Sequence, residues 1–214
     1  LKPISATPQV TADFTTASAN TGCGSLVVEF IDLSTGAPDA WLWDFGNGNT
    51  STQKNPLTIY STPGIYNVTL TASNNSFSNS TVSVGFVKVF TNPTADLIVN
   101  SVLAGCLPFS VSFSDISTFS SPIASWQWDF GDGGSSSMQN PNYIYSTDGN
   151  FSVSLSIVDG NDCQSLFIAN NIIDVDKEPI ASFNTDITFS CDVTEIVNFS
   201  NTSLYGTDYF WDFG

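Results

Sequence analysis

The sequence predicts an all-β protein built from tandem β-sandwiches. The four residues Trp-Asp-Phe-Gly begin at positions 43, 128 and 211, so they recur at spacings of 85 and 83 residues. Such a regular recurrence is typical of a structural repeat. Each repeat of about 85 residues holds roughly seven short alternating segments separated by turn residues, which fits a sandwich. No helical periodicity extends over more than two turns.

The repeated motif ends an alternating run of aromatic residues. Trp41, Trp43 and Phe45 occupy every second position, as do Trp126, Trp128 and Phe130 in the second copy. Alternate residues of a strand share one face, so each set is predicted to face a core. The motif residues are Trp43, Asp44 and Gly46, then Trp128, Asp129 and Gly131, then Trp211 and Asp212. An aromatic site that stacks on a sugar or a nucleotide remains the alternative.

A tight turn is expected directly after the motif. The first copy continues as Gly-Asn-Gly at 46–48 and the second as Gly-Asp-Gly at 131–133. Glycine, Asn and Asp are the residues that turns with positive φ require. Asp44 and Asp129 face away from the predicted core, and we expect them to accept hydrogen bonds from the turn that follows.

Repeat 1 is assigned to residues 1–91, and its strands follow from alternation and turn signals. The expected strands are Val10–Thr15, Leu26–Ile31, Ala40–Phe45, Ile59–Tyr60, Tyr66–Ala72 and Thr81–Phe90. In the fifth strand Tyr66, Val68, Leu70 and Ala72 form the inward set. The alternation of the last strand changes phase at Gly85, which predicts a β-bulge.

Repeat 2 covers residues 92–177 and matches repeat 1 segment by segment, while 178–214 match only the beginning of a repeat. That last segment has three expected strands, so its aromatic residues should lack a second sheet to cover them. They are Phe183, Phe199, Trp211 and Phe213. The linkers, 90–93 and 176–179, are short and contain proline, which favours a semi-rigid series of domains. We interpret the sequence as a section of a longer repeat protein.

The charge balance excludes several function classes. Twenty acidic residues stand against four lysines, with no Arg or His, giving a net charge of −16. Nucleic-acid binding needs cationic contacts to phosphate, and anionic lipid is disfavoured for the same reason. Without histidine, Ser–His and Cys–His catalysis are excluded. No stretch has the ~18 apolar residues needed to cross a bilayer. We therefore expect no enzyme activity, no nucleic-acid partner and no membrane insertion.

Two motif pairs resemble the signature of the polycystic kidney disease (PKD) domain. Trp43-Asp-Phe-Gly-Asn-Gly48 is followed by Tyr60-x3-Gly64-x-Tyr66, and Trp128-Asp-Phe-Gly-Asp-Gly133 by Tyr145-x3-Gly149-x-Phe151. The resemblance covers two complete copies and one partial copy. Asn47 departs from the second Asp of the signature. Phe151 departs from its tyrosine, so repeat 2 should lack a tyrosine-hydroxyl bond there.

The resemblance implies an immunoglobulin-like fold, an extracellular location at the cell surface and a non-catalytic role. Members of the family act as spacers or adhesive modules in surface proteins, or accompany secreted hydrolases. It therefore implies a stalk section of a long adhesin or surface filament. The alternative is an accessory region of a secreted hydrolase that binds substrate or carbohydrate. Expected partners are neighbouring repeats of the same chain, other copies in a filament, or surface glycans.

The four cysteines suggest one disulfide bond. Cys23, Cys106 and Cys191 each precede the second strand of a repeat, whereas Cys163 lies in the turn before the last strand of repeat 2. Cys106 and Cys163 are the only two within one repeat, and we predict that they are joined. Cys191 would then pair outside these residues. Cys23 would stay free or bond to another segment.

The second linker carries alternating acids. Asp174, Asp176 and Glu178 share one face of an extended chain, and calcium prefers such oxygen ligands. A calcium site is one interpretation, and an acidic strand edge that resists pairing is the other. No other cofactor is expected.

Seven Asn-x-Ser/Thr sequons are present, close to the number that the composition gives by chance. Asn67 faces outward on its predicted strand. We take Asn67 and Asn150 as the glycosylation candidates.

Overall fold

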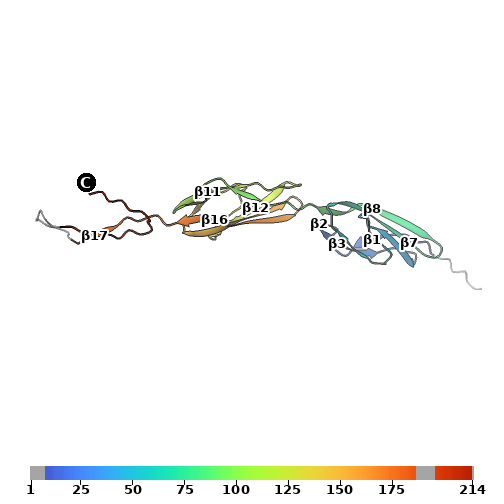
Figure 1. The fold of residues 1–214 in the computed structure, drawn as a ribbon. Helices are drawn as coiled ribbons and strands as arrows, with labels where there is room; N and C mark the ends of the chain where they lie inside the picture. Colours follow the sequence, from blue (N-terminus) through green and yellow to red (C-terminus); the bar gives the residue numbers. More distant parts are fainter. Residues whose placement is uncertain (1–7, 187–195, 214) are drawn as a thin grey trace, which may run out of the picture. The chain divides into compact units, whose positions relative to one another are not determined.

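The computed structural model describes residues 8–186 and 196–213, and these form strands and loops (Figure 1). The predicted all-β class is therefore confirmed. Within the described ranges, no helix is long and apolar enough to cross a membrane.

Repeat 1 forms a sandwich of a three-stranded and a five-stranded sheet, in the orders β1-β3-β6 and β2-β8-β7-β4-β5. Its strands are β1 (Phe14–Thr16), β2 (Thr21–Cys23), β3 (Leu26–Asp32), β4 (Ala40–Asp44), β5 (Thr50–Ser51), β6 (Leu57–Tyr60), β7 (Gly64–Ser73) and β8 (Ser78–Phe90). The neighbours pair antiparallel except β2 and β8, which are parallel. The first expected strand is shorter than its pattern, since before Phe14 only Thr11 makes a bridge, to Thr35.

Repeat 2 forms a second sandwich with the same architecture, in the orders β14-β11-β9 and β10-β16-β15-β12-β13. Its strands are β9 (Leu97–Val99), β10 (Ala104–Cys106), β11 (Phe109–Asp115), β12 (Ile123–Asp129), β13 (Ser135–Ser136), β14 (Asn142–Tyr145), β15 (Gly149–Asp159) and β16 (Gln164–Asp176). Here β10 is parallel to β16, as β2 is to β8. The sequence repeat is thus also a repeat of strand pairing.

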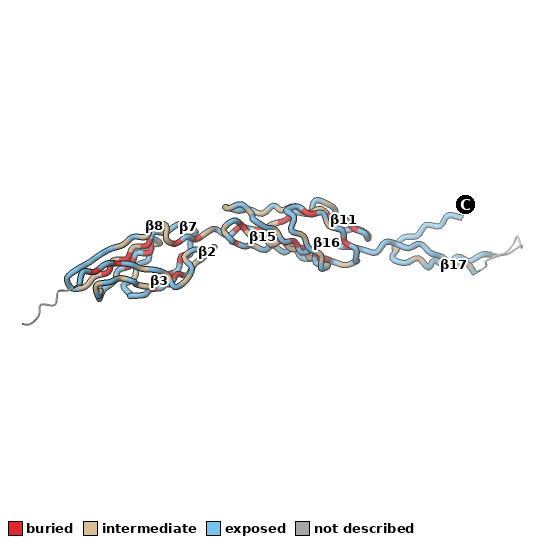
Figure 2. Tube along the Cα trace, turned by 180° about the vertical axis from the view of Figure 1, so that it is seen from behind, coloured by how far each residue is buried: buried red, intermediate tan, exposed pale blue. Residues whose placement is uncertain are grey.

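The core of each sandwich consists of the alternating residues of both sheets, as Figure 2 shows in red. In repeat 1 the fully covered side chains include Val28, Trp43, Tyr60, Val68, Leu70, Ala72 and Val87. In repeat 2 they include Val111, Trp128, Phe130, Tyr145, Val153, Leu155 and Ile157. Burial of this apolar area between two sheets is the main stabilising contribution.

The motif tryptophans are the largest core residues. Trp43 and Trp128 are 0% exposed. Each indole still donates a hydrogen bond from Nε1, to the carbonyl of Gln53 at 2.9 Å and of Met138 at 2.8 Å. Because the indole N–H has an acceptor, burying the ring carries no free-energy penalty for an unpaired donor. The alternative of a ligand-stacking site is wrong for both, because neither ring reaches the surface.

The Asp of the motif holds the turn as predicted. Asp44 Oδ1 accepts from the amide of Gly46, and Asp129 Oδ1 accepts from that of Gly131, both at 2.9 Å. Gly46 has φ of 72° and Gly131 of 85°. A Cβ on either glycine would lie about 2.5 Å or less from a carbonyl oxygen of the adjacent strand. Only glycine fits there.

The bulge expected near Gly85 is present. The register of β7 and β8 shifts between Tyr66 and Val68, and Gly85 has φ of 61°. Asn67 Oδ1 accepts from the Gly85 amide at 2.7 Å, which holds the bulge. Val82 and Val84 before it are exposed, whereas Val87 and Val89 after it are buried.

The tyrosine departure also has its expected effect. In repeat 1 the Tyr66 hydroxyl donates to the carbonyl of Thr62 at 2.5 Å. In repeat 2 Phe151 has no hydroxyl, and its ring stacks on that of Tyr145 with centroids 4.8 Å apart. The ring of Tyr66 contacts that of Tyr60 at a similar distance, 4.7 Å, so repeat 2 keeps the aromatic contact and lacks only the hydrogen bond.

The described parts of the last segment, 178–186 and 196–213, contain two short paired strands, β17 (Phe183–Thr185) and β18 (Phe199–Asn201). The third expected strand, at the motif, does not form. In the complete repeat 1 the motif strand β4 lies between β7 and β5, and no such partners flank 209–213 within the described chain. As predicted, the aromatic residues are uncovered: Phe183 is 56% and Phe213 70% exposed.

Two glycines of the second turn form a matched pair for a test. Gly131 and Gly133 both have positive φ, of 85° and 93°. A Cβ on Gly131 would lie 2.5 Å from the carbonyl oxygen of Ser152, whereas on Gly133 it would meet nothing within 4 Å. We expect Gly133→Ala to cost about 1 kcal/mol of unfolding free energy, from φ alone. Gly131→Ala should cost at least twice as much, in urea titration of the full chain. Equal losses would contradict the assigned close approach.

Candidate functional site

A disulfide bond joins Cys23 of repeat 1 to Cys163 of repeat 2. Their Cα atoms are 5.6 Å apart, and the bond closes a separation of 140 residues. The predicted pairing of Cys106 with Cys163 is therefore wrong, and Cys106 is free and exposed. The prediction assumed that a disulfide stays within one repeat. The structure instead groups residues 156–166 with repeat 1 in one compact unit.

Cys23 lies at a strand end and Cys163 lies in a turn. Cys23 ends β2, where the parallel pairing with β8 places it opposite Phe90. Cys163 lies in the turn between β15 and β16, and its amide donates to Asp159 Oδ1 at 2.9 Å. The amide of Asn161 donates to the same oxygen at 2.8 Å. Asp159 therefore shapes the turn that carries Cys163.

Asp159 is also the most buried acidic residue of the described chain. It is 1% exposed, and its second oxygen, Oδ2, is covered without a hydrogen-bond donor. Asn74 occupies the corresponding turn of repeat 1 and accepts from Ser76 and Phe77 in the same way. Its Nδ2 donates to the carbonyls of Pro8 and Gly36, both at 3.1 Å. In repeat 1 both polar atoms of the Asn74 side chain therefore make hydrogen bonds, whereas in repeat 2 the Oδ2 atom of Asp159 makes none.

The other two cysteines are Cys106, which is free, and Cys191. Cys106 ends β10, opposite Asp176 of β16, and so occupies in repeat 2 the place of Cys23 in repeat 1. Cys191 lies outside the described residues, and its predicted pairing stays a prediction.

The acids of the second linker do not gather. Asp174, Asp176 and Glu178 are all exposed. Within the part of the chain that the structure describes, no three His, Cys, Asp or Glu side chains are grouped so that they could hold a metal ion. Lys177, between two of them, forms an ion pair with Asp148 at 3.8 Å instead. The geometry gives the calcium interpretation no support.

The glycosylation candidates lie at the surface. Asn67 and Asn150 are both exposed, on β7 and β15. Asn67 uses its Oδ1 in the bulge, whereas a glycan would be attached to its Nδ2. Glycosylation of either residue stays a prediction.

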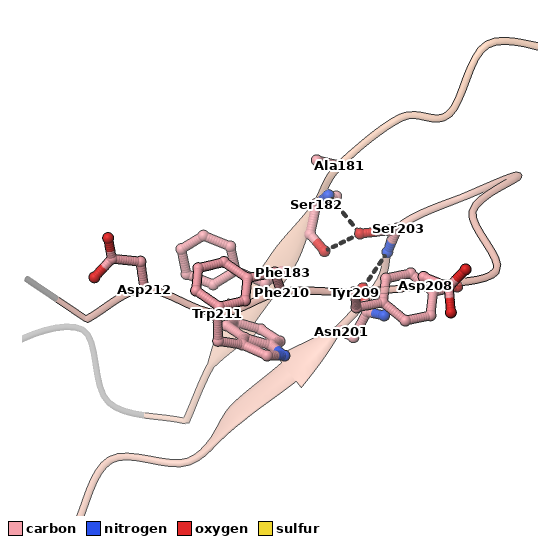
Figure 3. A pocket seen from close by; sticks show the side chains of 10 residues that line it. All are labelled: Ala181, Ser182, Phe183, Asn201, Ser203, Asp208, Tyr209, Phe210, Trp211 and Asp212. Atoms are coloured by element: carbon pink, nitrogen blue, oxygen red, sulfur yellow. Dashed lines mark hydrogen bonds between the residues drawn. The ribbon is translucent and has the colours of Figure 1, made fainter.

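A hollow of about 360 Å³ lies on the aromatic side of β17 and β18 (Figure 3). The ring of Phe183 meets that of Trp211 edge-on at 5.6 Å, and Trp211 is 37% exposed. The Ser203 hydroxyl donates to the carbonyl of Ser182 at 3.1 Å and accepts from its amide at 3.0 Å. In repeats 1 and 2 the second sheet covers the corresponding aromatics. The hollow therefore lies over the aromatic residues that the second sheet covers in the two complete repeats.

The titratable groups with shifted pKa values are tyrosines of the sandwich. Burial, together with the hydrogen bond to Asp132, raises the pKa of Tyr143 to about 12. Burial also raises the pKa of Tyr60 and of Tyr145, whose hydroxyls donate to the carbonyls of Phe45 and Phe130. These shifts hold the phenols protonated, which suits structural hydrogen bonds rather than nucleophiles or bases.

Fold, turn and core together define a tandem of immunoglobulin-like sandwiches. A family model of the PKD domain matches residues 5–89 and 90–171, which is more than half of the chain. The chain therefore belongs to the PKD-domain family, as its motifs predicted.

Solved structures provide further comparisons. The PKD1 domain of the Vibrio cholerae metalloprotease PrtV is 28% identical, with 40% of this chain and 99% of that chain covered and a TM-score of 0.35. The PKD1 domain of Vibrio anguillarum Epp is 25% identical, with 41% and 99% covered and a TM-score of 0.35. A chain from a bacterial ice-binding adhesin is 11% identical, with 84% and 69% covered and a TM-score of 0.44.

The pairing of the cysteines can be tested directly. Peptide mapping of the oxidised full chain without reductant should yield a peptide that joins Cys23 to Cys163, because their Cα atoms are 5.6 Å apart. Cys106 should be recovered in an alkylated peptide, since it is exposed and free. A peptide joining Cys106 to Cys163 would contradict the structure and restore the pairing expected from sequence.

The turn at Asp159 gives a second test, with two substitutions at one position. Asp159→Ala removes the acceptor of two amides, one buried and one partly buried, and should cost about 1–3 kcal/mol of unfolding free energy. Asp159→Asn keeps Oδ1 and replaces the unpartnered oxygen with a donor, as Asn74 does in repeat 1. We expect its loss to be below about 1 kcal/mol, or a gain. If the two variants lose equal stability in urea, Oδ2 has a partner of its own.

Proposed function

We propose that the chain is a non-catalytic spacer section of an extracellular repeat protein, a cell-surface adhesin or a surface filament. The observation that carries the proposal is the Cys23–Cys163 bond, which joins consecutive repeats to each other. A bond that fastens one domain to the next serves the connection between domains.

The same bond supports the location. Disulfides form and persist in oxidising compartments, whereas cytosolic thiols are kept reduced. The net charge of −16 favours solubility and repulsion between neighbouring chains. Both features suit a surface-exposed polymer, and PKD domains are generally non-catalytic modules.

The motif tryptophans of both sandwiches belong to the cores. Trp43 and Trp128 are fully covered, and the outer sheet faces carry many hydroxyl side chains. Some of these bond to each other across strands, as Thr71 does to Ser80 at 3.0 Å. A face of paired hydroxyls is soluble and offers no aromatic platform for sugar. We take neighbouring repeats as the principal partners, with other copies or surface glycans as further ones.

Surface exposure on native cells is the first test. An antibody raised against the chain should stain intact cells as strongly as permeabilised ones, because a spacer lies outside the membrane. A cytosolic protein of the same cells serves as the control for integrity. Staining confined to permeabilised cells would contradict the proposal.

Retention of the purified chain on insoluble polysaccharides separates the spacer role from the accessory role. A spacer should wash through cellulose and chitin columns with an inert protein of equal charge. Retention on either column would overturn the spacer role and favour the accessory region of a secreted hydrolase.

A further inference from the structure

The Cys23–Cys163 bond encloses nearly all of both sandwiches in one covalent loop. The loop contains the thirteen strands from β3 to β15, together with the linker at 90–93. Of the sixteen strands in the two repeats, only β1, β2 and β16 lie on the chain outside it. This follows from the connectivity alone and does not depend on how the repeats are oriented.

We propose that this bond is a mechanical bypass, which carries tension applied to the chain ends around both cores and the linker. Its biological use rests on the proposed spacer function. A pulling force enters through residues 1–23 and leaves through residues 163–214. Once the folded contacts yield, the sulfur–sulfur bond connects these two segments directly, and the loop between them is not stretched.

The outer strands are the ones that tension can remove. β1 and β2 lead into Cys23, and β16 begins one residue after Cys163. β16 carries the buried residues Ile173 and Val175, so its removal would open the core of repeat 2. The chain that is then released still has its ends fixed 5.6 Å apart, as the Cα distance of the two cysteines requires. Unfolding therefore does not lengthen the loop.

The effect on length is large. A separation of 140 residues, at about 3.5 Å per extended residue, spans about 490 Å when the bond is absent. With the bond, the same segment contributes 5.6 Å. The loop also keeps the strands of both sandwiches close together, which lowers the entropy that refolding must overcome.

The bypass is reversible by thiol chemistry. A dithiol such as dithiothreitol reduces the bond in two exchange steps, giving the thiols of Cys23 and Cys163 while the dithiol becomes a cyclic disulfide. Two electrons and two protons pass to the protein. The reduced chain has no bypass, and tension then reaches both cores and the linker in series.

Single-molecule pulling of the full chain by handles at residues 1 and 214 tests the proposal. The oxidised protein should reach a final contour length about 490 Å shorter than the Cys23→Ser, Cys163→Ser double variant. Cys106→Ser removes an exposed thiol outside the bond and should match the oxidised wild type. Dithiothreitol on the wild type should reproduce the length of the double variant, even if that variant folds poorly.

Equal contour lengths for the oxidised wild type and the double variant would overturn the bypass. A shortening of only about 200 Å, abolished by Cys106→Ser, would also overturn it, since that length fits a loop from 106 to 163. The measurement uses purified protein and is independent of where the protein resides. Failure of the surface-staining test would thus leave the bypass intact, and failure here would leave the surface location intact.

Discussion

Burial of one tryptophan between two sheets is the interaction on which each repeat depends. Trp43 and Trp128 lie fully covered on strands β4 and β12, which pair with β7 and β5 and with β15 and β13. An aromatic neighbour two residues on, Phe45 or Phe130, lies on the same face. The Asp between them points the other way and holds the glycine turn. A single alternating strand thus fixes the core on one face and the hairpin on the other. The remaining strands of the two sheets bury the aromatic face of this strand.

Residues 178–213 show what the same motif does without that cover. Trp211 and Phe213 lie beside Phe183 and Phe199, as their counterparts do in repeat 1, but they form no strand and remain exposed. In residues 209–213 the aromatic contacts are present and the strand is not. Pairing with the flanking strands supplies the backbone hydrogen bonds that a strand requires.

Alternation and turn chemistry made most of the fold predictable. The inward set of Val68, Leu70 and Ala72 and the bulge at Gly85 follow from the period of two and from one glycine. The partner of Cys163 did not follow, because its contact with Cys23 joins residues 140 positions apart. The parallel pairing of β2 with β8 was missed for a similar reason, since three residues carry too little pattern to reveal a partner. One feature of the sequence could have indicated that Asp159 Oδ2 lacks a hydrogen bond, namely the Asn at the matching position 74. That correspondence is visible only once the two turns are aligned.

The central claim is that the motif strand is ordered by the two sheets that enclose it. Native-state hydrogen exchange of a protein that consists of residues 1–214 tests this most directly, residue by residue. The amides of β4 and β12 should be among the slowest to exchange in their repeats, while those of 209–213, with the same motif, should exchange at nearly the rate of unprotected peptide. Comparable protection of all three motif copies would contradict the claim, because it would show that the motif is ordered without the flanking strands.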